Sequence, residues 1–218
     1  MTTIISIQVR MGSTRLPGKI LLGLPSKPLL AQVIEQCLAA ERPNDIVVAI
    51  GDEPPNEAIV EWCERTDCRY IEGPESNLLE RHRRVAAETN CDLLVRITGD
   101  CPFVPPEEID RLVRIHQQND AVLTTNNTKT MPTGTAVDII DCETLAALAS
   151  EGATHPVAPL RSENSSRRVT VSDSERWTEF GSAHTAVDTP ADYWRIIDAV
   201  NAVGTDPYDV TSWLATCE

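Results

Sequence analysis

The stretch R-M-G-S-T-R-L-P-G-K, residues 10–19, decides the fold of this chain. It follows I-I-S-I-Q-V, residues 4–9, an apolar and β-branched run that is typical of a buried strand. It precedes residues 29–40, where apolar side chains recur at helical spacing. The stretch is therefore predicted to be a loop between a strand and a helix. Such a loop lies at the carboxyl end of a first parallel strand, where open α/β sheets bind their ligands.

The composition of this loop favours a polyphosphate ligand. Gly12 and Gly18 allow close approach of the backbone, and the N–H groups near Ser13 and Thr14 can line an anion nest. Three cations within the stretch stand out, because the whole chain has three lysines and a formal net charge of -14. The alternative is a solvated basic loop. We expect the loop to hold a triphosphate, and the nucleotide-binding candidates in and before it are Gln8, Arg10, Gly12, Ser13, Arg15 and Lys19.

Length and composition suit one domain. The 218 residues, 41% of them hydrophobic, can bury the core of a single α/β domain, residues 1–218. Residues 126–182 are expected to form a less regular portion of it, on the acceptor side or at a dimer contact.

No apolar run approaches the roughly 18 residues of a membrane span, and the seven cysteines form no C-x-x-C pair. We therefore expect a cytoplasmic protein with free thiols and no membrane partner.

The charge balance argues against nucleic acid as a partner. Asp plus Glu number 33 against 19 Lys plus Arg, and a pI near 4.7 leaves no general basic surface for a phosphate backbone. Scarce lysine among abundant acidic residues also suits a surface that stays hydrated in concentrated salt. An ordinary acidic cytosolic protein is the equal alternative.

The order of strand and helix patterns predicts the sheet. Strands and helices alternate through the first half of the chain, which implies a doubly wound, mainly parallel sheet with right-handed crossovers. Strands are predicted at residues 4–9, 45–50, 68–71, 92–98, 121–125, 136–140, 167–171 and 183–187. Helices are predicted at residues 29–40, 55–65, 76–89 with Ser76 as N-cap, 105–118, 142–150 and 190–203.

Two aspartates are free for a task other than local folding. Asp100 follows the fourth strand across a glycine and lies several residues before the next helix, too far to cap it. Asp188 lies one residue outside a capping box formed by Thr189 and Asp192. Both end strands at the carboxyl edge of the predicted sheet, so together they can hold Mg²⁺. The alternative for each is a turn residue that bonds its own backbone.

Other candidates carry weaker signals. Asn77 and Arg81 are four residues apart on one helix face, where they contact either a ligand or solvent. Arg96 alternates with apolar residues in its strand and points either to a partner or to the ligand. The four histidines fall on no metal-ligand spacing. Cys101 has no visible base partner, so covalent catalysis is unsupported.

Four motifs together resemble a known family. They are R-M-G-S-T-R-L-P-G-K after an apolar strand, S-N-L-L-E-R, R-I-T-G-D-C-P and V-D-T-P-A-D-Y. In this order and spacing, over residues 4 to 197, they look like the cytidylyltransferases that activate acidic sugars. The most similar branch is that of the spore-coat polysaccharide biosynthesis proteins, related to the Kdo and acylneuraminate cytidylyltransferases.

The resemblance implies a fold and a set of roles. The fold would be the α/β sandwich of nucleotide-diphospho-sugar transferases, and a homodimer is a candidate assembly because many members dimerise. In that family the loop binds the CTP phosphates, its lysine contacts the α-phosphate region, and aspartates hold Mg²⁺. By resemblance these roles fall on Arg10, Gly12, Ser13, Arg15, Lys19, Asp100 and Asp188.

The acceptor side departs from the family pattern. Near M-P-T-G-T-A-V-D, residues 131–138, the related branch shows P-x-G-x-D-x-E, whereas this chain has Ala136 and Asp138 at the two acidic positions. That segment borders the acceptor sugar in the family. Residues 152–182 also match poorly, so the resemblance identifies the nucleotide better than the acceptor.

The sequence thus predicts a Mg²⁺-dependent nucleotidyltransferase. An acceptor oxygen on a small acidic sugar would attack the α-phosphorus of CTP, with Lys19, Arg15 and Asp100 as the catalytic candidates. Asp100 and Asp188 would hold the metal. The rival is a nucleotide or nucleotide-sugar binding module without turnover, and CTP is not separated from other triphosphates by the residues alone. A dehydrogenase is disfavoured, because no G-x-G-x-x-G follows the first strand.

Overall fold

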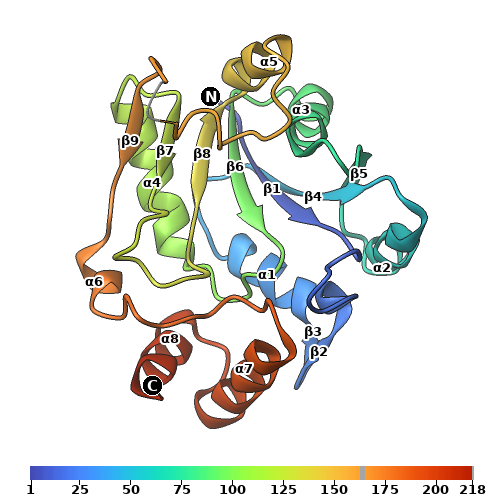
Figure 1. Cartoon of the computed structure of the whole chain (residues 1–218), viewed down its shortest axis with the longest axis vertical. Coiled ribbons are helices and arrows are strands. Elements are labelled where there is room, and N and C mark those ends of the chain that lie inside the picture. Colours follow the sequence, from blue (N-terminus) through green and yellow to red (C-terminus); the bar gives the residue numbers. More distant parts are fainter. Residues whose placement is uncertain (163–164, 218) are drawn as a thin grey trace.

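One seven-stranded sheet forms the centre of the molecule (Figure 1). The computed structural model describes residues 1–162 and 165–217. Among the described strands of this sheet, only the fifth in spatial order, β8, runs opposite to the others. The doubly wound, mainly parallel α/β class predicted from sequence is confirmed. In spatial order the strands are β5 (Tyr70–Gly73), β4 (Asp45–Gly51), β1 (Thr3–Val9), β6 (Leu93–Thr98), β8 (Asp138–Asp141), β7 (Leu123–Thr125) and β9 (Val169–Val171).

Helices cover both faces of the sheet. One face packs against α1, α2 and α4, with α7 and α8 beyond, and the other against α3 and α5. Two 3-10 turns and the ribbon of β2 (Gly23–Leu24) and β3 (Lys27–Pro28) complete the chain. The turns are η1 (Lys19–Leu21) and η2 (Pro54–Asn56), and the helices are α1 (Leu29–Leu38), α2 (Glu57–Arg65), α3 (Leu78–Thr89), α4 (Pro106–Gln118), α5 (Cys142–Ser150), α6 (Glu175–Thr178), α7 (Pro190–Val203) and α8 (Pro207–Thr216).

Strand β1 shows how the sequence pattern builds two cores. Successive side chains of a strand point to opposite faces. Ile5 and Ile7 pack toward α1, while Ile4 packs in the core under α3 and α5. Ser6 and Gln8 share the face of Ile4, and both are polar. Polar residues are therefore brought to the α3 side of the sheet, next to the carboxyl end of the strand.

One predicted helix cap and one predicted strand differ from the structure. Helix α3 is capped by Asn77, not Ser76, because the Asn77 side chain accepts a hydrogen bond from Glu80 N–H (3.0 Å). The strand predicted at residues 183–187 is wrong, since that segment makes only the isolated bridge Thr133–His184 within the described residues. The backbone of this segment instead forms hydrogen bonds with Thr133 and Asp100.

Two helices were not predicted, α6 and α8. Helix α8 has a sequence signal for its start, because Asp206 precedes a proline and caps the helix by accepting from two backbone N–H groups. Within the described residues no helix has both the length and the apolar character needed to cross a bilayer.

Candidate active site

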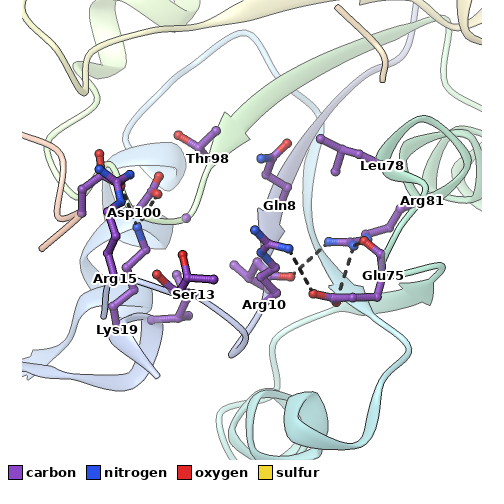
Figure 2. Close-up of a pocket in the computed structure, with 15 residues that line it drawn as sticks. Gln8, Arg10, Ser13, Arg15, Lys19, Glu75, Leu78, Arg81, Thr98 and Asp100 are labelled. Atoms are coloured by element: carbon purple, nitrogen blue, oxygen red, sulfur yellow. Dashed lines mark hydrogen bonds and ion pairs between the residues drawn. The ribbon is translucent and has the colours of Figure 1, made fainter. Parts of the chain in front are cut away.

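The strand order creates a crevice at one edge of the sheet. β4 and β6 lie on opposite sides of β1 and run parallel to it, so the loops that follow β1 and β6 separate there. A cavity of about 330 Å³ opens at this point (Figure 2). Its lining residues are Gln8, Val9, Arg10, Ser13, Thr14, Arg15, Lys19, Ile20, Glu75, Leu78, Arg81, Thr98, Gly99, Asp100 and Asp188.

Lys19 organises one end of the cavity. Gly18 has a φ of 73°, a left-handed conformation that favours glycine, and it turns the chain into η1 so that Lys19 faces inward. Only 7% of Lys19 is exposed. Its Nζ donates to Asp100 Oδ2 (2.6 Å), Val187 O (2.7 Å) and Asp188 Oδ1 (3.1 Å). One ammonium group thus joins the loop to two segments that lie far away in sequence.

The two predicted metal aspartates therefore lie together. Both contact the same Lys19 nitrogen, and Asp188 Oδ1 also pairs with Arg15 Nη2 (2.8 Å). Asp188 is held in place by the predicted capping box, in which Thr189 accepts from Asp192 N–H and Asp192 accepts from Thr189 N–H. Within the described residues no group of three or more acidic, histidine or cysteine side chains could hold a metal. A metal ion bound here would be coordinated by these two carboxylates and by oxygen atoms of a bound substrate or water.

The backbone of the loop leaves donors available to an anion. Ser13 N–H donates to Met11 O (2.9 Å), so it is not available to the expected anion nest. The N–H groups of Thr14 and Arg15 make no hydrogen bond within the described residues. Gly12 does not line the cavity, and a Cβ there would meet only an ordinary contact with Glu75. Of the two positions named from the sequence, Thr14 therefore keeps a free N–H and Ser13 does not, and Arg15 supplies a second free donor.

The opposite end of the cavity is built around Glu75, a residue that sequence reasoning missed. Arg10 Nη1 lies 3.5 Å from Glu75 Oε1, and Figure 2 shows the pair away from Lys19 and Asp100. Arg81, predicted to bind nucleotide, lines this end. Its guanidinium donates to the carbonyl oxygens of Val9, Pro74 and Glu75, and burial lowers its pKa.

Asn77, the other predicted contact on this helix, does not line the cavity. Its side-chain oxygen accepts from Glu80 N–H and so caps α3. Asn77 lies at the amino end of the helix as its spacing from Arg81 predicts, but the cap uses its oxygen.

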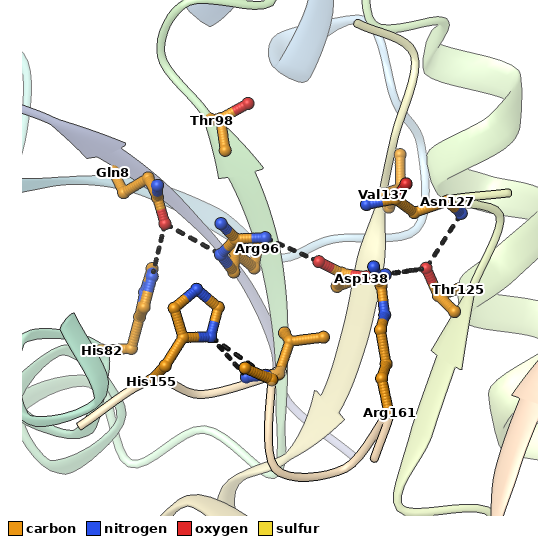
Figure 3. A network of polar contacts seen from close by, with 12 residues as sticks. Gln8, His82, Arg96, Thr98, Thr125, Asn127, Val137, Asp138, His155 and Arg161 are labelled. Carbon is orange, nitrogen blue, oxygen red and sulfur yellow. Dashed lines mark hydrogen bonds and ion pairs between the residues drawn. The ribbon is translucent and has the colours of Figure 1, made fainter. Parts of the chain in front are cut away.

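A polar network continues from the cavity across the sheet (Figure 3). Gln8 Oε1 accepts from Arg96 Nε (2.8 Å), and Arg96 Nη1 donates to Asp138 Oδ2 (2.7 Å). Asp138 is 1% exposed and also pairs with Arg161. Thr125 Oγ1 donates to the same carboxylate (2.7 Å). Of the two possibilities for Arg96, a partner within the chain or the ligand, the structure shows the first, since its guanidinium contacts Gln8 and Asp138.

Comparison with known proteins identifies the family to which this chain belongs. The cytidylyltransferase family model matches residues 4–189. The chain belongs to the cytidylyltransferase family. It is 28% identical to the spore coat polysaccharide biosynthesis protein SpsF of Bacillus subtilis, over 96% of this chain and 91% of that protein. It is 30% identical to the 3-deoxy-manno-octulosonate cytidylyltransferase of Chloroherpeton thalassium, over 56% of this chain and 49% of that protein.

A solved structure agrees in fold. A cytidylyltransferase from Leptospira borgpetersenii superposes with a TM-score of 0.90 at 24% identity, covering 99% of this chain and 94% of that one. The family resemblance read from the four motifs is confirmed, and with it the reaction class, transfer of CMP from CTP. Covalent catalysis by Cys101 gains no support, because burial raises the pKa of its thiol.

Proposed function

We propose that this cytidylyltransferase transfers CMP from CTP to a small acidic sugar, or sugar-like acceptor, and releases pyrophosphate in glycan biosynthesis. The observation that carries the proposal is the contact of one buried lysine, Lys19, with Asp100 and Asp188 at the end of a cation-lined cavity. Such a site can position a triphosphate and neutralise charge that shifts to the leaving group.

The reaction gives a role to four side chains of the loop. The acceptor oxygen forms a bond to the α-phosphorus, the bond from that phosphorus to the bridging oxygen breaks, and pyrophosphate leaves with the electron pair. Lys19 and Arg15 stabilise charge on the α-phosphate and on the leaving group. Arg10, Ser13 and the free N–H groups of the loop bind the remaining phosphate oxygens.

We assign Mg²⁺ to Asp100 and Asp188. Carboxylate oxygens are hard ligands, and Mg²⁺ in nucleotide sites takes one or two of them besides phosphate oxygens and water. Lys19 contacts one oxygen of each carboxylate, Asp100 Oδ2 and Asp188 Oδ1, which leaves the other oxygen of each for the ion. The residues present therefore fit the ion. When bound, Mg²⁺ neutralises phosphate charge.

The acceptor would lie beyond Gln8 and Thr98, toward the network of Figure 3. Arg161 reaches that network from the less regular residues 126–182. We propose that these residues belong to the single domain 1–218 and face either the acceptor or a second copy in a homodimer. An acidic acceptor is supported by the acid sugar for which the Kdo cytidylyltransferase relative is named and by the two arginines beside Asp138.

The binding-module alternative has one specific observation in its favour. Asp138, which stands where a glutamate is expected, is fully engaged by Arg96, Arg161 and Thr125. Its carboxylate is therefore not free for an acceptor. A protein of this kind would bind CTP and release no pyrophosphate.

A nucleotide panel with pyrophosphate detection tests the proposal. The protein is incubated with CTP, UTP, ATP or GTP, with Mg²⁺ or EDTA, and with a set of acidic sugars. We expect pyrophosphate with CTP and Mg²⁺ plus at least one acid sugar. Binding of CTP without pyrophosphate over the whole set would support the binding module instead. Preference for ATP, or no binding of any nucleotide, would contradict both.

A further inference from the structure

Arg10 is held at both of its neighbouring peptide groups. The carbonyl of Val9, directly before it, accepts from Arg81 Nη1 (3.2 Å). The N–H of Met11, directly after it, donates to Asn56 Oδ1 (2.7 Å). Two side chains from elements far away in sequence thus fix the backbone on either side of the first cation of the loop.

Asn56 is buried and almost fully hydrogen bonded. It is 2% exposed and lies at the end of η2, outside the set of cavity-lining residues. Its Nδ2 donates to Gly51 O (2.9 Å) and to Glu75 Oε2 (3.0 Å). Gly51 makes room for this arrangement, since a Cβ there would lie 1.6 Å from Glu75 Oε2. The packing around Asn56 therefore specifies where the Glu75 carboxylate lies.

Glu75 connects the same contacts to the Arg10 side chain. Its carbonyl accepts from Arg81 Nη2 (2.9 Å), and its N–H donates to Asp52 Oδ1 (3.1 Å). The second oxygen of its carboxylate, Oε1, faces Arg10 Nη1 at 3.5 Å. The Arg10 side chain is 56% exposed, so without this partner it would sample many rotamers.

We infer that Asn56 is a positioning residue for nucleotide binding, acting with Glu75 and Arg81 as a clamp that holds Arg10 in its binding conformation. The inference rests on the proposed binding of CTP in this cavity. The clamp lowers the entropy that is lost when Arg10 engages the phosphates, so it affects affinity for CTP and not the chemical step. It also gives Arg81 a structural task in place of direct nucleotide contact.

A double-mutant cycle separates positioning from general support of the fold. Asn56→Ala and Glu75→Gln are made in the native chain and in Arg10→Ala, and CTP affinity is measured by calorimetry with Mg²⁺. We expect about tenfold weaker binding for Asn56→Ala and about fivefold for Glu75→Gln in the native background. In the Arg10→Ala background both losses should shrink below about twofold. KM for CTP should rise while kcat at saturating CTP stays within about twofold.

Asn44→Ala is the matched control. Asn44 Oδ1 accepts Thr3 N–H (2.8 Å), so it holds the opposite end of the same strand in the same way. Its loss should leave CTP affinity unchanged. Equal losses with and without Arg10, or unchanged affinity for both clamp variants, would overturn the clamp while CTP binding itself stands. If Asn56→Ala does not fold, the Glu75→Gln cycle decides alone. Failure of the unaltered protein to bind CTP would instead contradict the proposed function.

Discussion

At the scale of single residues, the sequence identified which side chains gather but not how they pair. Lys19, Asp100 and Asp188 were each predicted for the site, the lysine for phosphate and the aspartates for metal. The structure shows the ammonium group between the two carboxylates. Loop composition predicts a kind of ligand, whereas this pairing depends on three segments meeting in space. Glu75 and Asn56 gave no sequence signal for the same reason.

Lys19→Ala is therefore expected to affect both activity and stability. Turnover should fall on the order of a hundredfold, because a preorganised charge-stabilising donor is lost. Loss of three hydrogen bonds from a buried ammonium should also lower stability on the order of 2 kcal/mol, about 5 °C in Tm, without nucleotide. Adding Asp100→Asn should recover part of the Tm, since it removes the carboxylate that loses its cationic partner, whereas Asp188 still pairs with Arg15.

Thermal unfolding and pyrophosphate release measure the two effects separately. Lys27→Ala serves as the control, because Lys27 pairs only with Glu35 at the surface within the described residues. Unchanged turnover of Lys19→Ala at saturating CTP would remove Lys19 from the mechanism. An unchanged Tm would show that its three contacts do not stabilise the fold.

At the scale of elements, periodicity predicted most of the sheet and its helices. Where apolar residues alternate or recur every three to four positions, as in β1 and α1, the period of the pattern distinguishes a strand from a helix. Residues 183–187 also contain apolar residues, but within the described residues they pair with no strand, and their backbone bonds Thr133 and Asp100 instead. Pairing partners are a property of the topology, which a local pattern does not contain.

The packing of α3 on β1 gives a prediction about pH. His82 of α3 is fully buried, and its Nδ1 lies 2.8 Å from Ser6 Oγ on β1. Burial, with the nearby Arg96 and Arg81, holds the pKa of His82 well below its ordinary value. In the unfolded chain that pKa is about 6.5. As pH falls below about 6.5, the unfolded chain binds a proton that the folded chain does not, so stability decreases.

His82→Asn should reduce this acid sensitivity. The difference in unfolding free energy between pH 7 and pH 5 should be smaller in the variant by about 2 kcal/mol, since one pH unit corresponds to about 1.4 kcal/mol per proton. Denaturant unfolding at the two pH values measures it. The same pH dependence in both proteins would show that His82 does not contribute to acid unfolding.

At the scale of the whole molecule, charge is distributed unevenly. The chain carries a formal charge of -14, yet the cavity lining has four cations, Arg10, Arg15, Lys19 and Arg81, against the three carboxylates of Glu75, Asp100 and Asp188. Composition predicted both features, the acidic surface and the cationic loop, because each depends only on counts and local density. The continuation of the cavity into the Arg96–Asp138–Arg161 network was beyond reach, since Arg161 comes from a segment without periodicity.

Salt dependence tests how much the acidic surface opposes folding. Exposed ion pairs weaken in salt and contribute at most about 1 kcal/mol each, while self-repulsion of a net charge of -14 is relieved by the same screening. With so large an imbalance, repulsion should dominate at pH 7. Tm should therefore rise between low salt and about 0.15 M KCl, where the screening length is about 8 Å.

Two further conditions separate the sources of the effect. Near the pI of about 4.7 the net charge vanishes, so the rise in Tm should disappear or reverse if repulsion causes it. At pH 7, an ordinary acidic protein should reach a plateau once screening is complete. A salt-adapted surface, the alternative that the scarcity of lysine left open, should keep gaining Tm well above the concentration at which repulsion is screened. A fall in Tm on the first addition of KCl would mean that ion pairs, and not net charge, control the stability of this molecule.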